Sequence, residues 1–184
     1  MTILEAVNYI LTACGMPTVA SVPASGLAYD ASFELAASNT RIQGERSWFY
    51  NTIHNKEYEP DEVTSKISMS GVIRFSNSSK PDVAIRNGYL YDLYDETDEF
   101  DSSVYLDAVI EQTFTTLTET QAEYITADAA WRFQRKRKRD KEDDDRLGAE
   151  RALARVRAIQ EDMDMSGSRG NLLSTRRMRQ SRGE

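Results

Sequence analysis

Six acidic residues within ten positions form the first group whose types and spacing could do chemistry: Asp92, Asp95, Glu96, Asp98, Glu99 and Asp101. Paired carboxylates can share acid and base work when their surroundings separate their pKa values. Carboxylate oxygens also suit Ca²⁺, but the spacing differs from that of an EF-hand loop, which also needs a glycine inside it. We interpret the group as a solvated or subunit-facing loop and keep ion binding or catalysis as the alternative.

The chain has one histidine and one cysteine, which limits its other chemistry. His54 precedes a polar stretch, a setting typical of a surface or hydrogen-bonded histidine. Cys14 lies on an apolar helical stripe, which predicts a small buried side chain and not a nucleophile. A single cysteine excludes an internal disulfide and a Cys-based zinc site, and a single histidine argues against a His-rich site. We therefore predict that the protein is not an enzyme and binds no metal and no cofactor.

The charges are segregated along the chain, whose net charge is -7. The basic run Arg132–Arg139 leads directly into the acidic run Asp140–Asp145, and the segment 166–184 carries five further arginines. Such segregation favours docking onto charged surfaces. The basic run could bind nucleic-acid phosphates. However, it lacks the interleaved aromatic residues of a single-strand binder, and the acidic run offsets its attraction. We favour a solvated helix end, or a loop that pairs with the acidic run of an adjacent copy, and keep a nucleic-acid-binding module based on Arg132–Arg139 as the alternative.

The elements that must position these residues begin and end with helices. Apolar residues recur at helical spacing from Ile3 to Cys14, and a second helix is expected from about Gly26 to Arg46, paired antiparallel with the first. A capping box at Thr118–Gln121 predicts a third helix, and an apolar stripe predicts a fourth over about Glu142–Met163, ended by Ser166-Gly167-Ser168. The remaining segment to residue 184 is arginine-rich and is expected to lack structure on its own.

The middle of the chain changes to the pattern of strands. We expect strands at Trp48–Ile53, Val72–Phe75 and Val104–Phe114, with Trp48 as a core anchor. A hairpin is predicted where Asn87-Gly88 separates two apolar runs, because both residues accept a positive φ. Trp131 and Phe133 are two positions apart in a helix and cannot share one face, so one could face the core and the other a neighbour.

The order of elements predicts an α+β protein: a bundle of about four helices, two N-terminal and two C-terminal, with a small, mainly antiparallel β-domain inserted between them. The expected parts are the N-terminal helices over 1–47, the β-domain over 48–116, the C-terminal helices over 117–165 and the basic tail over 166–184. No apolar run approaches the roughly 20 residues of a membrane-spanning helix.

Short motifs spread over most of the chain resemble the tail tubular protein A family of short-tailed, podovirus-type phages. The matching residues are Ala6-Val7-Asn8, Ile10-Leu11, Gly15, Pro17, Val19, Asn39, Arg41-Ile42-Gln43, Trp48-Phe49, Asn51, Gly88–Asp92, Thr97–Asp101, Tyr124-Ile125, Ala129-Ala130, Phe133 and Asn171-Leu172-Leu173.

The resemblance implies a structural protein of the virion tail, made in the host cytoplasm. Such adaptors, or gatekeepers, form a homo-oligomeric, dodecameric ring between the portal protein and the tail nozzle (tail tubular protein B), and tail fibres dock near the junction. The ring surrounds the channel of DNA ejection, through which genomic DNA passes without specific binding, and no membrane is involved. The family fold is similar to the helical domain plus β-domain predicted above.

Two sets of residues are then the candidates for contacts. Portal or neighbour contacts are expected from the basic run, the acidic run and the tail: Arg132, Arg135, Arg137, Arg139, Asp143, Asp144, Asp145, Arg169, Leu172, Leu173, Arg176, Arg177 and Arg179. Nozzle or neighbour contacts are expected from the acidic loop: Asp95, Asp98 and Asp101. We also expect the segment 166–184 to order on the portal.

Overall fold

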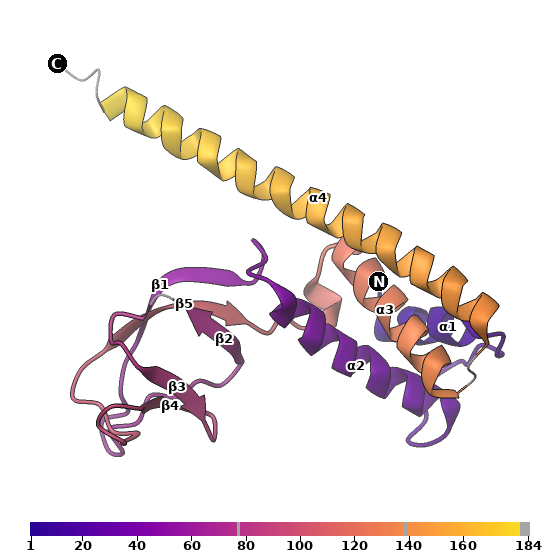
Figure 1. Cartoon of the computed structure of the whole chain (residues 1–184), viewed down its shortest axis with the longest axis horizontal. Coiled ribbons are helices and arrows are strands. Elements are labelled where there is room, and N and C mark those ends of the chain that lie inside the picture. Colours follow the sequence, from indigo (N-terminus) through magenta and orange to yellow (C-terminus); the bar gives the residue numbers. More distant parts are fainter. Residues whose placement is uncertain (77, 138–139, 181–184) are drawn as a thin grey trace. The chain divides into compact units, whose positions relative to one another are not determined.

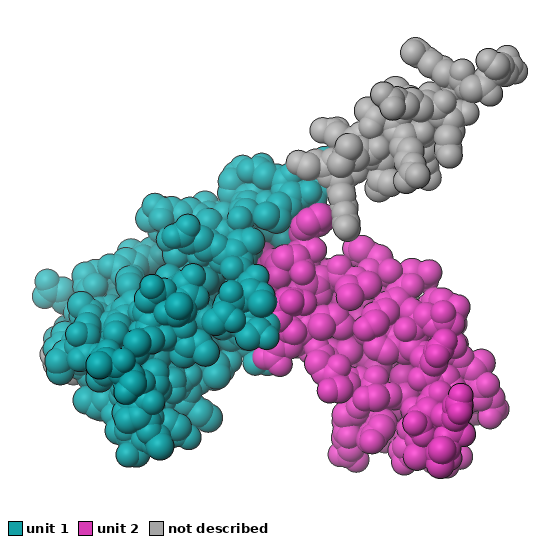
Figure 2. Space-filling model, turned by 180° about the vertical axis from the view of Figure 1, so that it is seen from behind, with its two compact units in different colours: residues 1–42, 113–184 teal, residues 43–112 magenta. Residues whose placement is uncertain are grey.

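The computed structural model describes residues 1–76, 78–137 and 140–180, the last part from residue 168 by its backbone alone. The chain divides into two compact units, coloured separately in Figure 2. Unit 1 comprises Met1–Ile42 and Thr113–Glu184, and unit 2 comprises Gln43–Gln112. Unit 1 is helical and unit 2 holds the strands, so the chain is an α+β protein, as predicted.

Unit 1 is built on four α-helices, with the short 3-10 helix η1 (Phe114–Thr116) before the third (Figure 1). They are α1 (Ile3–Ala13), α2 (Leu27–Glu45), α3 (Glu119–Arg137) and α4 (Lys141–Gln180). The closest helix contacts are those of α3 with α1 and with α4. The expected pair of α1 and α2 is therefore not the principal contact, because α3 occupies the centre of the unit.

Local sequence explains the bounds of α1. The Thr2 side chain accepts from the Glu5 backbone N–H, and the Glu5 carboxylate accepts from the Thr2 backbone N–H, which completes a capping box. At the other end Gly15 has a φ of 71°, where glycine is favoured because it has no Cβ. The buried face is apolar: Ala6, Val7, Ile10 and Leu11.

The last helix is longer than the sequence predicts. The expected stop at Ser166-Gly167-Ser168 is wrong, because the helical backbone of α4 continues to Gln180. Glycine costs a helix about 1 kcal/mol relative to alanine, but the following segment has no proline and is rich in good helix formers such as leucine, arginine and methionine. Seven tail and linker candidates lie outside the described side chains: Arg139, Arg169, Leu172, Leu173, Arg176, Arg177 and Arg179.

The strand pairs among the described residues of unit 2 are antiparallel. The three-stranded sheet has the order β1-β5-β2, and β3 pairs with β4. The bounds are β1 Thr52–Tyr58, β2 Val72–Ser76, β3 Val83–Arg86, β4 Tyr89–Asp92 and β5 Val104–Ile110. The β3–β4 hairpin is confirmed, with Asn87 at φ 52° and Gly88 at φ 79° in its turn. The small core of the unit includes Ile67, Leu90, Leu106 and Ala108.

Two strand predictions need correction. The segment Trp48–Asn51 forms a turn, in which the Trp48 carbonyl accepts from the Thr52 N–H at 3.0 Å, so β1 begins only at Thr52. Trp48 is fully buried, as predicted for a core anchor, but it is buried from a turn. The strand expected to reach Phe114 ends at Ile110, because Phe114 is buried from the 3-10 helix η1.

Candidate functional site: two charged clusters

A buried carboxylate organises the charges of unit 1. Asp128 of α3 has no exposed surface and is held by three arginines, which we name the arginine hub: Arg41 of α2, Arg132 of α3 and Arg151 of α4. The Nε atoms of Arg132 and Arg151 lie 3.0 and 2.6 Å from its carboxylate oxygens, and Arg41 forms a third ion pair. Ser38 of α2 donates its hydroxyl to Asp128 at 2.7 Å. The cluster thus connects three helices.

The hub carries more positive than negative charge. Burial alone would raise the pKa of Asp128, but hydrogen bonds from Ser38, Arg41 and Arg151 lower it, so the carboxylate is ionised. Among the described residues, Asp128 is the acidic side chain that pairs with these three guanidinium groups. Three guanidinium charges around one carboxylate leave an excess of two positive charges, and each arginine side chain keeps roughly a third of its surface exposed.

Trp131 lies beside the hub, beneath two arginines. The guanidinium groups of Arg135 and Arg151 lie 4.7 and 4.9 Å from the centre of its ring, within cation–π distance. Gly148 of α4 faces the same indole without a clash. Phe133 is buried while Trp131 is partly exposed, so the two do occupy different faces of α3. A neighbour for Trp131 remains a prediction.

The other described cations of the basic run, Arg135, Lys136 and Arg137, pair within the chain. Arg135 faces Asp144 of α4 at 3.5 Å, Arg137 pairs with Asp30 of α2 at 2.7 Å, and Lys136 pairs with Glu34 of α2. Of the acidic run, Asp143 faces Arg146 at 3.3 Å and accepts from Gln134, and Asp145 is exposed. The basic run therefore pairs with the acidic run and with α2 of the same chain. The sequence analysis did not predict this intramolecular pairing. In the described part of the run, Arg132 is the member that belongs to the hub.

The acidic loop of unit 2 is built on a second buried carboxylate. Asp92 accepts hydrogen bonds from the backbone N–H groups of Tyr94 and Asp95, at 2.8 and 3.1 Å, and pairs with Lys80 at 2.5 Å. The Lys80 hydrogen bond is the main cause that lowers the pKa of Asp92 to about 2, with the two backbone donors adding to it. Asp92 therefore shapes the loop and is not an acid or base near neutral pH.

The other acids of the loop differ in their surroundings. Asp95 lies 3.5 Å from Lys80 and Asp98 lies 2.7 Å from Lys66, whereas Glu96, Glu99 and Asp101 are exposed. Among the described residues no group of three or more His, Cys, Asp or Glu side chains is arranged to hold a metal ion. The arrangement presents negative charge on a well-fixed loop.

His54 lies at the surface, as predicted, whereas Cys14 is only partly buried and not fully buried as expected. Burial raises the pKa of the Cys14 thiol to about 11, so it is protonated near neutral pH, and its Sγ faces the Ala130 carbonyl at 3.8 Å. The His54 side chain is 72% exposed, with its Nδ1 3.4 Å from Asp107. Neither residue has the surroundings of a catalytic group.

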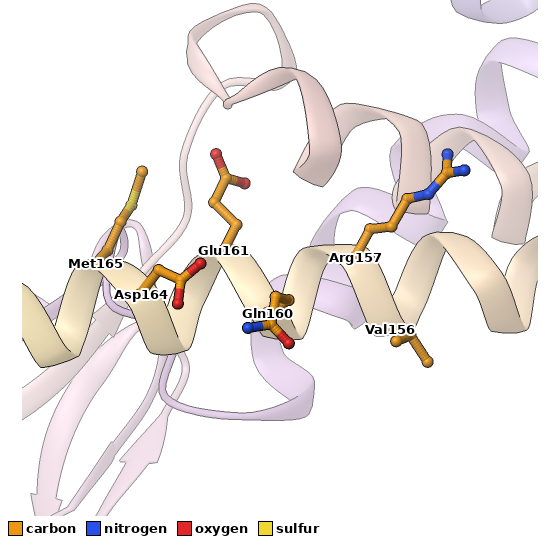
Figure 3. Close-up of a pocket in the computed structure, with 6 residues that line it drawn as sticks. All are labelled: Val156, Arg157, Gln160, Glu161, Asp164 and Met165. Carbon is orange, nitrogen blue, oxygen red and sulfur yellow. The ribbon is translucent and has the colours of Figure 1, made fainter.

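Unit 1 also exposes apolar side chains. A shallow hollow of about 570 Å³ is lined by one face of α4, whose side chains are shown in Figure 3: Val156, Arg157, Gln160, Glu161, Asp164 and Met165. A groove of about 480 Å³ between α2 and α3 is lined by Tyr29, Phe33 and Phe133, with ion-paired residues around it. The groove, lined by aromatic side chains, resembles an uncovered protein contact more than a substrate site, whereas the α4 hollow is lined mainly by polar and charged side chains. No described helix has the length and apolar character to cross a membrane.

The hub was missed by sequence analysis because its members lie far apart in the chain. One signal was present: Asp128 stands among Ala127, Ala129 and Ala130 on a helix that is buried around much of its surface. A charged residue in such a setting must be paired, so it predicts cationic partners from other elements. Which arginines supply them depends on the tertiary fold.

Comparison with known proteins gives one clear match. A family model described as tail tubular protein matches residues 4–169, which include all of unit 2 and most of unit 1. No curated protein matches the chain.

Proposed function

The chain belongs to the tail tubular protein family, and on this premise we propose that it is the adaptor that joins the portal to the tail nozzle. Membership makes it a structural component of a phage tail, which assembles with other tail components. The proposal adds a dodecameric ring around the channel of DNA ejection, a portal above it and tail fibres near the nozzle junction.

The observation that carries the proposal is the family match together with uncovered contact surfaces on both units. Unit 1 presents the apolar α2–α3 groove and the exposed face of α4, and unit 2 presents the acidic loop. A closed ring of identical chains needs two different complementary faces on each copy. The candidate contacts are those predicted above. We assign the helical unit and its tail to the portal or a neighbouring copy, and Asp95, Asp98 and Asp101 to the nozzle or a neighbouring copy.

Genomic DNA is expected to pass through the ring without sticking, because an acidic lining repels phosphate. Unit 2 has fourteen acidic residues against six lysines and arginines, a net charge of -8, which supplies such a surface. The alternative, DNA binding by Arg132–Arg139, is less well supported because Arg135, Lys136 and Arg137 are already paired within the chain.

Electron microscopy of the purified protein mixed with its portal tests the proposal. We expect a ring stacked beneath the portal, coaxial with its channel. If the protein does not bind the portal but shifts duplex DNA in a gel at moderate salt, the result would instead support the nucleic-acid-binding module.

A further inference from the structure

We propose that the arginine hub is a receiving site for acidic side chains of a second copy of this chain, supplied by its loop Asp95–Asp101. The inference rests on the proposed ring and adds to it which charged groups meet. Its starting point is the excess of two positive charges at Arg41, Arg132 and Arg151 around the single carboxylate of Asp128.

This excess distinguishes the hub from the other cations of the basic run that the structure describes. Arg135, Lys136 and Arg137 each have an acidic partner of their own, in α2 or α4. The three hub arginines instead share one carboxylate, although the surroundings are partly shielded from water. Like charges held close together in such a place repel one another, and a further carboxylate relieves that repulsion. The partly exposed side chains of Arg132 and Arg151 can pair with it in fork geometry, whereas Nε and Nη2 of Arg41 are buried.

The acidic loop has the opposite imbalance. Asp92 forms an ion pair with Lys80, and Asp98 forms one with Lys66. Glu96, Glu99 and Asp101 are exposed, and unit 2 as a whole has a net charge of -8. Four hydrogen bonds and ion pairs involving Asp92 and Asp95 fix the loop, so little conformational entropy is lost when it docks. A ring brings the loop of one copy and the hub of another together as two different faces.

A phosphate group is the competing anion, and the arrangement favours the carboxylate. Binding to duplex DNA depends on many cations spread along the backbone. Here the cations that would extend the hub along α3 are neutralised inside the chain. The hub is therefore a compact site, matched to a few acidic side chains.

The experiment measures ring assembly on the portal by mass photometry with the wild type and five full-length variants. Arg132→Gln removes one hub charge while Arg41 and Arg151 still hold Asp128, so the fold is kept. The combined change Glu96→Gln and Asp101→Asn removes two exposed acids of the loop. The matched controls are Arg146→Gln, an exposed and internally paired arginine of α4 that is not among the candidate contacts, and the combined change Glu59→Gln and Glu62→Gln, two exposed acids of unit 2.

We expect the hub variant and the loop variant each to weaken assembly about tenfold, with both controls near wild type. Combining the hub and loop changes should give about the same tenfold loss, because the two act on one contact. Additive losses, or an equal loss with Arg146→Gln, would show general charge effects and overturn the proposal.

Two other results also overturn it, and they differ in what they say of the ring. If the wild type assembles and the hub variant assembles equally well, the ring stands and the hub contact fails. If the wild type does not assemble at all, the ring and the hub contact fail together. A gel shift with duplex DNA completes the test: loss of DNA binding by Arg132→Gln with unchanged assembly would make the hub a phosphate site.

Discussion

Asp128 of unit 1 and Asp92 of unit 2 are both buried carboxylates with a lowered pKa, but the two are stabilised by different parts of the chain. Asp92 is bound by two backbone donors within three residues and by Lys80, so it fixes a local loop. Asp128 accepts a hydrogen bond from Ser38 and forms ion pairs with three arginines, and these residues come from three helices. Its contacts therefore fix tertiary structure. A buried charge can thus serve either a turn or the packing of a whole unit.

The largest loss of stability is expected when Asp128 is replaced. Replacing Asp128 by asparagine leaves three partly buried guanidinium groups without a counter-charge, which should cost unit 1 about 3 kcal/mol. Urea denaturation followed by Trp131 fluorescence, with Trp48→Phe as the common background, measures the free energy of unfolding. The control Asp30→Asn removes an exposed partner of Arg137 and should cost about 1 kcal/mol or less. Equal losses for the two variants would contradict a central role for Asp128.

The next prediction concerns the stability of the loop around Asp92, which should depend on pH. The pKa of Asp92 is about 2 in the folded chain against 3.8 ordinarily, so its ionised form stabilises the loop fully above about pH 4. That stabilisation is lost as the pH falls from about 4 to about 2. The exchange of the Tyr94 and Asp95 amide hydrogens, corrected for intrinsic rates, should therefore accelerate over this range.

The variant Asp92→Asn supplies the reference for this pH effect. It should show fast exchange at those two amides with little dependence on pH, because asparagine does not titrate. Asp101→Asn, on the exposed part of the loop, should keep the wild-type profile. A wild-type exchange profile that stays flat from pH 4 to 2 would show that the charge of Asp92 does not hold the loop.

The two carboxylates also show how far the sequence predicts the molecule. The α+β class, the Asn87-Gly88 hairpin and the start of α1 follow from local patterns, since turns, caps and periodicity involve neighbouring residues. The acidic loop was recognised for the same reason. The hub was not, because Arg41, Asp128 and Arg151 come from three helices and no spacing links them. The turn at Trp48 was missed because aromatic residues favour strands as well as buried turns.

A smaller effect is expected where α2 ends in unit 2. A Cβ added at Gly44 would lie 2.9 Å from Cγ2 of Ile73, a stiff β-branched side chain. Overpacking of this kind costs about 1–3 kcal/mol, of which the better helix propensity of alanine returns up to about 1 kcal/mol. Gly44→Ala should therefore destabilise unit 2 by about 1 kcal/mol in urea denaturation followed by Trp48 fluorescence, with Trp131→Phe as the background. An unchanged midpoint would mean that Ile73 moves aside without cost.

The same substitution in α4 should have the smallest effect and the opposite sign. A Cβ added at Gly148 would meet Trp131 Nε1 at 3.6 Å, an ordinary contact, while alanine improves the helix. Gly148→Ala should stabilise unit 1 by about 0.5–1 kcal/mol, measured through Trp131 fluorescence as for Asp128→Asn. Because Arg151 lies over the same indole, the variant also tests whether the hub tolerates a tighter α3–α4 contact. A loss of stability would show that the hub depends on the spacing of the two helices. The loop around Asp92 has no such dependence, because its contacts come from the neighbouring backbone and from one lysine.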